Sequence, residues 1–101
     1  MNVETTNRPG LLTLTVGRTY RAKKPGRIAN FPSPLVNDRT IIWIGQHELQ
    51  YDGPSVRLGS KYPRMSIELF RQWADRDVTD ELPEGHYATW PITKAKQPQP
   101  A

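Results

Sequence analysis

The stretch Arg-Thr-Ile-Ile-Trp-Ile, residues 39–44, decides the fold of this chain. It is an unbroken run of β-formers with turn residues on both sides, and its length favours a strand over a segment of helix. Alternate side chains of a strand point to opposite faces, so we expect Ile41 and Trp43 on one face and Ile42 and Ile44 on the other. Because both faces then have to be covered, we predict that this strand lies in the middle of a small curled sheet or barrel, with Trp43 in the core.

Length and composition set the class of protein. The chain has 101 residues, with 10 prolines and 7 glycines spread along it. This length suits one domain, and the spread of turn residues is typical of many short segments in a β-rich fold. Cysteine is absent, which excludes disulfides, thiolate metal sites and cysteine nucleophiles. The sequence shows neither a signal-peptide pattern nor an apolar run near the ~20 residues of a membrane span, so we expect a cytoplasmic protein.

Alternating apolar residues before the central stretch predict two short strands. These are Leu11–Val16 and Thr19–Lys23, with a bulge or sharp bend at Gly17 between them. Tyr20 then points into the core. The outward positions of the second strand are Thr19, Arg21 and Lys23. Residues 1–10 precede these strands as a flexible lead-in.

The segment Lys24–Asp38 is rich in proline and shows no periodicity, so it is predicted to be a long loop. After the central strand, Leu49 and Tyr51 alternate with polar residues up to the turn Asp52-Gly53-Pro54. Val56 and Leu58 then alternate in the same way. This pattern predicts a hairpin with favourable turn residues.

A short helix is predicted over residues 67–74, with Ser66 as its N-cap and Met65 and Phe70 as a hydrophobic staple. Its apolar side is made by Ile67, Leu69, Phe70, Trp73 and Ala74, and Trp73 is expected in the core. Residues 75–84 are acidic and turn-like, and residues 85–92 suggest a last strand. We therefore predict a single domain over residues 11–93 and a disordered tail over 94–101.

Three sequence segments resemble those of a known class of proteins: residues 16–22 (Val-Gly-Arg-Thr-Tyr-Arg-Ala), 38–44 (Asp-Arg-Thr-Ile-Ile-Trp-Ile) and 66–73 (Ser-Ile-Glu-Leu-Phe-Arg-Gln-Trp). In spacing and residue type the chain resembles small accessory proteins of tailed phages and prophages over roughly residues 16–74. The resemblance implies an SH3-like β-barrel and a phage-type binding protein without a fixed function. It carries no catalytic signature.

Signals for an enzyme, a metal or a cofactor are weak. His47 and Glu48 are neighbours on a predicted strand and point to opposite faces, so they are unsuited to a catalytic dyad. Asp75, Asp77 and Asp80 have calcium-loop spacing at first glance, but the sixth position lacks the glycine and the twelfth lacks the glutamate of such a loop. We therefore expect a non-enzymatic protein with a solvated acidic turn.

Basic residues concentrate in the N-terminal third. Residues 1–37 hold six basic groups against one acidic group, a charge of +5, whereas the whole chain carries +4. Cations mixed with aromatic rings neutralise phosphates and stack on bases, although the same charges can also form a plain solvated surface. Tyr62, in a turn beside Lys61, is the best exposed stacking candidate. The candidate nucleic-acid-binding residues are Arg18, Arg21, Lys23, Lys24, Arg27, Arg57, Lys61, Tyr62 and Arg64.

Two functions are consistent with these features. The first is docking on nucleic acid or a host nucleoprotein complex through the basic N-terminal face. The alternative is an adaptor or inhibitor that binds a host defence or replication protein through Phe31, Tyr87 and Trp90, unless these rings only close the ends of the fold. A structural role in a virion is a third reading, and the predicted strand 11–16 could pair with a second copy of the chain.

Overall fold

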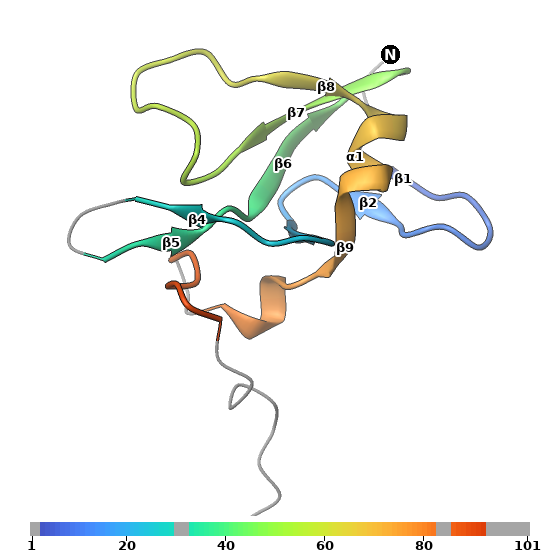
Figure 1. Cartoon of the computed structure of the whole chain (residues 1–101). Helices are drawn as coiled ribbons and strands as arrows, with labels where there is room; N and C mark the ends of the chain where they lie inside the picture. Colours follow the sequence, from blue (N-terminus) through green and yellow to red (C-terminus); the bar gives the residue numbers. More distant parts are fainter. Residues whose placement is uncertain (1–2, 30–32, 83–85, 93–101) are drawn as a thin grey trace, which may run out of the picture.

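The computed structural model describes residues 3–29, 33–82 and 86–92. The fold is mostly β-structure with one short α-helix, as predicted (Figure 1). A five-stranded antiparallel sheet, in the order β8-β7-β6-β3-β9, is joined by the two-stranded ladders β1-β2 and β4-β5. The elements are β1 (Thr5–Thr6), β2 (Leu14–Thr15), β3 (Thr19–Ala22), β4 (Arg27–Ile28), β5 (Leu35–Val36), β6 (Arg39–Ile44), β7 (Glu48–Asp52), β8 (Arg64–Ser66), α1 (Ile67–Trp73), β9 (Ala74–Asp77) and the 3-10 helix η1 (Thr79–Glu81).

The five-stranded sheet is curled but open. Among the described strands, β8 and β9 each have one neighbour in it, so they are edges and the sheet is not closed into a barrel. Strand β6 lies in its middle with the predicted bounds. The main core packs on one face of this sheet, beneath α1 and β2, and consists of Leu14, Tyr20, Ile41, Ile44, Leu49, Phe70 and Ala74. None of the helices in the described part of the chain is long and apolar enough to cross a membrane.

A bulge in β6 changes which of its side chains face the core. The register against β7 shifts between Ile41 and Trp43, so Ile42 is an extra residue. An extra residue reverses the alternation of side chains, and Ile41 and Ile44 are therefore both fully buried in the main core. The prediction that Trp43 lies in the core with Ile41 is wrong. Trp43 is half-buried on the opposite face, across from Gln50.

The bend between β2 and β3 lies at Gly17, as predicted, with a positive φ of 90° that favours glycine. The lead-in is not loose over residues 3–6. Val3 bridges Ile44, and β1 pairs with β2, so the predicted strand 11–16 is shortened to Leu14–Thr15 and is paired within the chain. This pairing covers the strand that was expected to be free for a second copy.

All four residues of β3 are buried, so the prediction that Thr19 and Arg21 point to solvent is wrong. Strand β3 lies between β6 and β9, and its second face is covered as well. The hydroxyl of Thr19 bonds that of Thr40, which also bonds the Tyr87 hydroxyl. Tyr20 is buried as predicted. Its hydroxyl donates to the Thr13 carbonyl and accepts from the Thr15 amide.

The segment 24–38 is more ordered than a loop, because it contains the β4-β5 ladder. Strand β5 also binds the C-terminal part of the chain. The Val36 amide donates to the Ala88 carbonyl, and Leu35 forms a bridge with Thr89. In the described residues of the predicted strand 85–92, pairing is limited to this bridge. Backbone hydrogen bonds to β5 therefore hold both β4 and the C-terminal part of the chain in place. Sequence periodicity does not encode such pairing.

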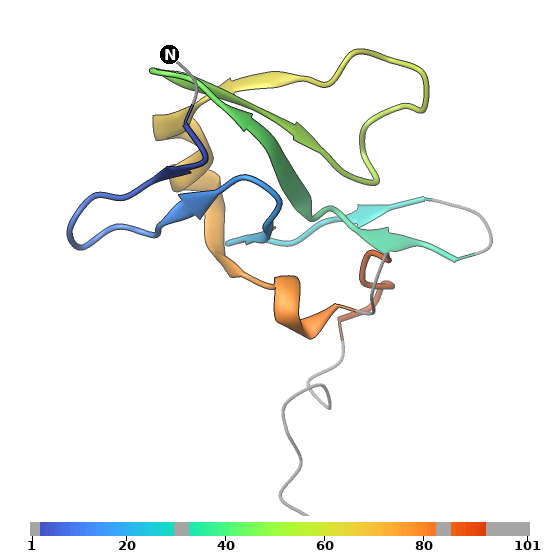
Figure 2. The same cartoon turned by 180° about the vertical axis from the view of Figure 1, so that it is seen from behind.

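Strand β7 pairs with β8 across an eleven-residue loop, 53–63, so the predicted strand at Val56 and Leu58 is wrong. Helix α1 begins as predicted, with the Ser66 hydroxyl accepting from the Leu69 amide at 3.0 Å. It ends one residue before the predicted Ala74, because Ala74 starts β9, which runs on to Asp77 where a turn was predicted. Leu69 faces solvent rather than the core. Figures 1 and 2 show that loop 53–63 and the β4-β5 ladder project from the same side of the molecule.

Candidate nucleic-acid interface

The structure divides the nine candidate nucleic-acid-binding residues into three groups. The first group is Arg18 and Arg21, just before and within β3, which both form ion pairs. Three are exposed along the segment that leads from β3 into β4, and four lie on the loop and strand after β7. The second group is Lys23, Lys24 and Arg27, and the third is Arg57, Lys61, Tyr62 and Arg64.

Arg18 is occupied by two carboxylates. Its Nε lies 2.7 Å from Asp77 Oδ2 and its Nη2 lies 3.2 Å from Asp80 Oδ2. Partial burial raises the pKa of Asp77, but hydrogen bonds from Arg18 and Thr79 outweigh it and leave this pKa below its usual value. The acidic residues at the end of β9 and in η1 thus neutralise one cation of the predicted basic face. Among the described residues, no group of three or more metal-ligating side chains is arranged to hold a metal ion.

Arg21 is inaccessible to a ligand on the surface. Its Nε and Nη2 donate to the two carboxylate oxygens of Asp38 at 3.0 and 2.9 Å, a bidentate geometry. The side chains of Arg21 and Asp38 are 8% and 0% exposed. Arg21 therefore stabilises the interior between β3 and the entrance to β6, and its charge is cancelled there.

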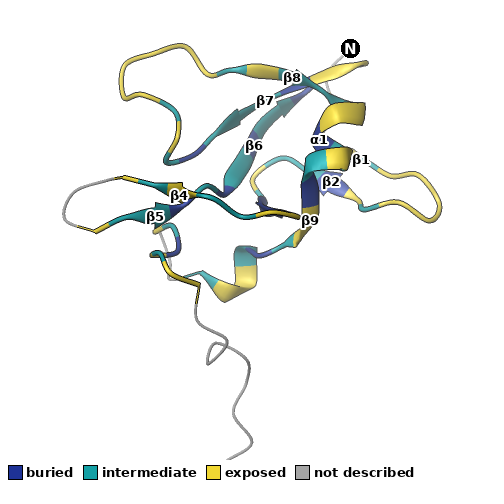
Figure 3. Ribbon diagram, viewed as in Figure 1, coloured by how far each residue is buried: buried dark blue, intermediate teal, exposed yellow. Residues whose placement is uncertain are grey.

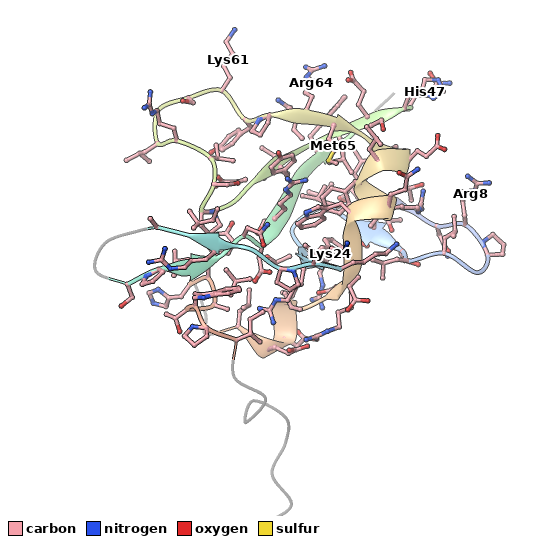
Figure 4. The ribbon with its side chains drawn as sticks, in the orientation of Figure 1. Arg8, Lys24, His47, Lys61, Arg64 and Met65 are labelled. Carbon is pink, nitrogen blue, oxygen red and sulfur yellow. The ribbon has the colours of Figure 1, made fainter. Side chains whose placement is uncertain are left out.

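Lys23, Lys24 and Arg27 are exposed, as predicted. In the described part of the chain, none of the three forms an ion pair. The Lys23 amide donates to the Trp73 carbonyl, which fixes the backbone where this segment leaves β3. In Figure 4, Lys24 lies over the middle of the molecule, away from Lys61 and Arg64 at its upper edge. The three cations thus form a sparse basic surface.

Residues 53–66, which we call the β7-β8 arm, carry three cations and no acidic residue. Arg57, Lys61 and Tyr62 are exposed, and the Tyr62 side chain is among the largest exposed apolar groups, at 47%. Within the described residues, Arg57 and Lys61 have no carboxylate within ion-pair distance. Figure 3 shows that the loop of the arm is exposed along most of its length. The arm thus has the cations and ring that the sequence suggested.

The base of the arm is fixed to the sheet. The Asp52 carboxylate accepts from the Gly53 amide at 2.8 Å, and the Gln50 side chain donates to the Tyr62 carbonyl at 3.2 Å. The Tyr51 amide donates to the Pro63 carbonyl. Gly53 is required where the arm begins, because a Cβ there would lie 2.4 Å from the Asp38 carbonyl oxygen. These contacts orient the arm relative to β7.

Arg64 of the arm belongs to a row of three side chains that runs across β6, β7 and β8. Trp43 is the register partner of Gln50, and Gln50 is the partner of Arg64, so the three share one face. The Arg64 guanidinium lies 5.1 Å from the centre of the Trp43 ring, and its Nη1 lies 3.5 Å from Glu48 Oε1. Trp43 and Gln50 were missed by sequence reasoning, because the bulge that turns Trp43 to this face leaves no periodic signal.

Arg39 lies on the core side of the same sheet and is a structural cation. Its guanidinium carbon lies 4.4 Å from the centre of the Tyr51 ring and 4.3 Å from that of Trp73. Its Nη1 contacts the Met65 sulfur, and its buried Nε has no hydrogen-bond partner among the described residues. Burial lowers the pKa of Arg39. Trp73 therefore lies partly buried at the rim of the core, where its ring stacks on the Arg39 guanidinium.

Of the alternative protein-binding site, the structure describes Tyr87 and Trp90, and both are less accessible than expected. Phe31 lies outside the described residues. Tyr87 is half-buried with its hydroxyl 3.0 Å from the Thr40 hydroxyl, and burial raises the pKa of Tyr87. Trp90 is half-buried, and its amide donates to the Pro34 carbonyl. A protein-binding role for these three residues stays a prediction.

His47 is exposed in the turn before β7, as expected for a surface histidine.

No protein-family model, curated protein or solved structure matches the chain. The resemblance to phage accessory proteins therefore stays an expectation, and the candidate function depends on the geometry of the β7-β8 arm.

Proposed function

We propose that this chain is a non-enzymatic binding protein that docks on nucleic acid, or on a nucleoprotein complex, through the β7-β8 arm. The observation that carries the proposal is that Arg57, Lys61 and Tyr62 are all exposed in a segment without acidic residues, and that neither cation has an ion-pair partner among the described residues. Lysine and arginine displace the counterions of a phosphate backbone, and a tyrosine ring can stack on bases. The resemblance to small phage accessory proteins supports a host nucleoprotein as one form of this partner.

The proposal moves the main contact away from the N-terminal basic face. Arg18 and Arg21 are neutralised by carboxylates, so that face keeps Lys23, Lys24 and Arg27 as its accessible candidates. The arm has the aromatic ring that this face lacks, because Tyr20 is buried. We assign Lys23, Lys24 and Arg27 a secondary, purely electrostatic contribution.

Salt dependence of binding tests the proposal. Fluorescence anisotropy with a labelled DNA oligonucleotide, between about 50 and 200 mM salt, should show affinity falling with a log–log slope of about −2.7 for three phosphate contacts on a duplex. The double variant Arg57→Ala/Lys61→Ala should reduce the magnitude of this slope by about 1.8 and weaken binding to all sequences.

The matched control is Lys23→Ala/Lys24→Ala, which removes the same charge from the other group. It should have the smaller effect. If the arm variant binds as tightly as the wild type and the control variant loses affinity, the main contact lies on the N-terminal basic face instead. Absence of any salt-dependent binding would contradict nucleic-acid binding altogether.

A further inference from the structure

The tip of the β7-β8 arm presents one apolar side chain almost completely to solvent. Leu58 is 98% exposed, whereas Leu69 and Leu11 are 53% and 47% exposed. Single exposed apolar residues are common on protein surfaces and need no special explanation. Leu58 differs in its position, because it is the middle residue of the projecting loop 53–63 and lies in the sequence between two exposed cations, Arg57 and Lys61.

Two hydrogen-bonded turns hold the tip in this shape. The Val56 amide donates to the Gly53 carbonyl at 3.0 Å, and the Ser60 amide donates to the Arg57 carbonyl at 3.1 Å. Gly59 has a φ of +86°, which suits the third position of a turn over residues 57–60. Leu58 is then the second residue of this turn. The local backbone therefore directs the leucine outward, and folding of the chain does not bury it.

The charges beside Leu58 define its partner. The arm carries +3 with no acidic residue, so it complements a polyanion. An apolar side chain gains from a polyanion only where that polyanion offers an apolar slot, and the stacked bases of a duplex offer one between base steps. Proteins that bind the minor groove use leucine and similar side chains as wedges between base steps, with arginine and lysine in or beside the groove. An anionic membrane is the weaker fit, because one leucine is too little apolar surface for stable anchoring.

We propose that the β7-β8 arm enters the groove of duplex DNA and that Leu58 acts as a wedge at a base step. This inference rests on the proposed nucleic-acid binding and adds the double-stranded form and the mode of contact. Arg57 and Lys61 would hold the flanking phosphates. Flexible pyrimidine–purine steps such as TA, which unstack most easily, would be the preferred sites.

The test uses a DNA duplex with 2-aminopurine at the adenine of a central TA step. This base becomes brighter when it is unstacked, so binding of the wild-type chain should increase its fluorescence. Leu58→Ala should abolish the increase and weaken duplex binding about tenfold, or about 1.4 kcal/mol, while single-strand binding changes less than about twofold. Leu69→Ala, which removes another exposed leucine, is the matched control and should behave as the wild type. Because Leu58 makes almost no contact within the fold, its replacement should leave the protein folded.

Any one of four results would overturn the wedge. Duplex binding without a change in 2-aminopurine fluorescence, or equal behaviour of the Leu58→Ala and Leu69→Ala variants, would refute it and leave the proposed nucleic-acid binding intact. Binding to single strands alone would do the same. Binding to phosphatidylserine–phosphatidylcholine vesicles, with no binding to either form of DNA, would refute the wedge and the proposed function together.

Discussion

The buried pair of Arg21 and Asp38 should be costly to break by removing one charge and much less costly to replace as a whole. Both carboxylate oxygens accept from the guanidinium, and both side chains are almost wholly excluded from water. Asp38→Asn removes the negative charge and leaves a cation buried beside a neutral amide. Removing one partner of such a pair costs about 3–5 kcal/mol, a large part of the 5–15 kcal/mol that is typical for a whole domain.

Urea unfolding, followed by tryptophan fluorescence, measures this cost directly. At about 4–8 °C per kcal/mol for a domain of this size, Asp38→Asn should also lower the melting temperature by well over 10 °C. The double variant Arg21→Met/Asp38→Leu removes both charges and fills the same space with apolar atoms. It should be much more stable than Asp38→Asn, because replacement of a whole buried pair is often neutral or stabilising by about 1–4 kcal/mol.

The surface pair of Arg64 and Glu48 is the matched control. These atoms are 3.5 Å apart on side chains that are 56% and 50% exposed, so Glu48→Gln should cost no more than about 1 kcal/mol. The reasoning is refuted if Asp38→Asn also costs less than about 1 kcal/mol. It is equally refuted if the double variant Arg21→Met/Asp38→Leu loses as much stability as Asp38→Asn.

Three further predictions concern stability. Gly45→Ala should cost about 1–3 kcal/mol in urea unfolding, because a Cβ would lie 2.4 Å from Trp43 Cη2 and the ring would have to move; an unchanged midpoint would refute this. Ser66→Ala should cost about 1 kcal/mol through loss of the N-cap, and a cost below about 0.3 kcal/mol would show that the cap is replaceable. The lowered pKa of Asp77 means that its carboxylate stabilises the fold above the ordinary value of 3.8, and that this contribution is lost as the pH falls through the folded-state pKa. Asp77→Asn should therefore melt below the wild type at pH 7 and approach it as the pH falls below 3.8 through the folded-state pKa, and a constant difference at all pH values would contradict this.

Short-range patterns predicted the local elements well. The run of β-formers at 39–44 became the central strand, Gly17 marked the bend, and Ser66 capped the helix. These features depend on neighbouring residues and on conformations that few residue types adopt, so they can be recognised from sequence alone. Of the candidate site, the exposed cations of the β7-β8 arm and Tyr62 were also predicted from local composition.

What the sequence by itself determined about this protein is therefore its β-rich class, its central strand and the basic, aromatic character of residues 57–64. Only the tertiary structure decided which cations are accessible, because Arg21 meets Asp38, 17 positions away and just before β6, and Arg18 meets Asp77 across 59 positions of sequence. It also decided the face on which Trp43 lies, since one extra residue in β6 reverses the alternation of side chains. Long-range ion pairs and bulges depend on strand pairing, and the pairing partners are brought together only when the chain folds.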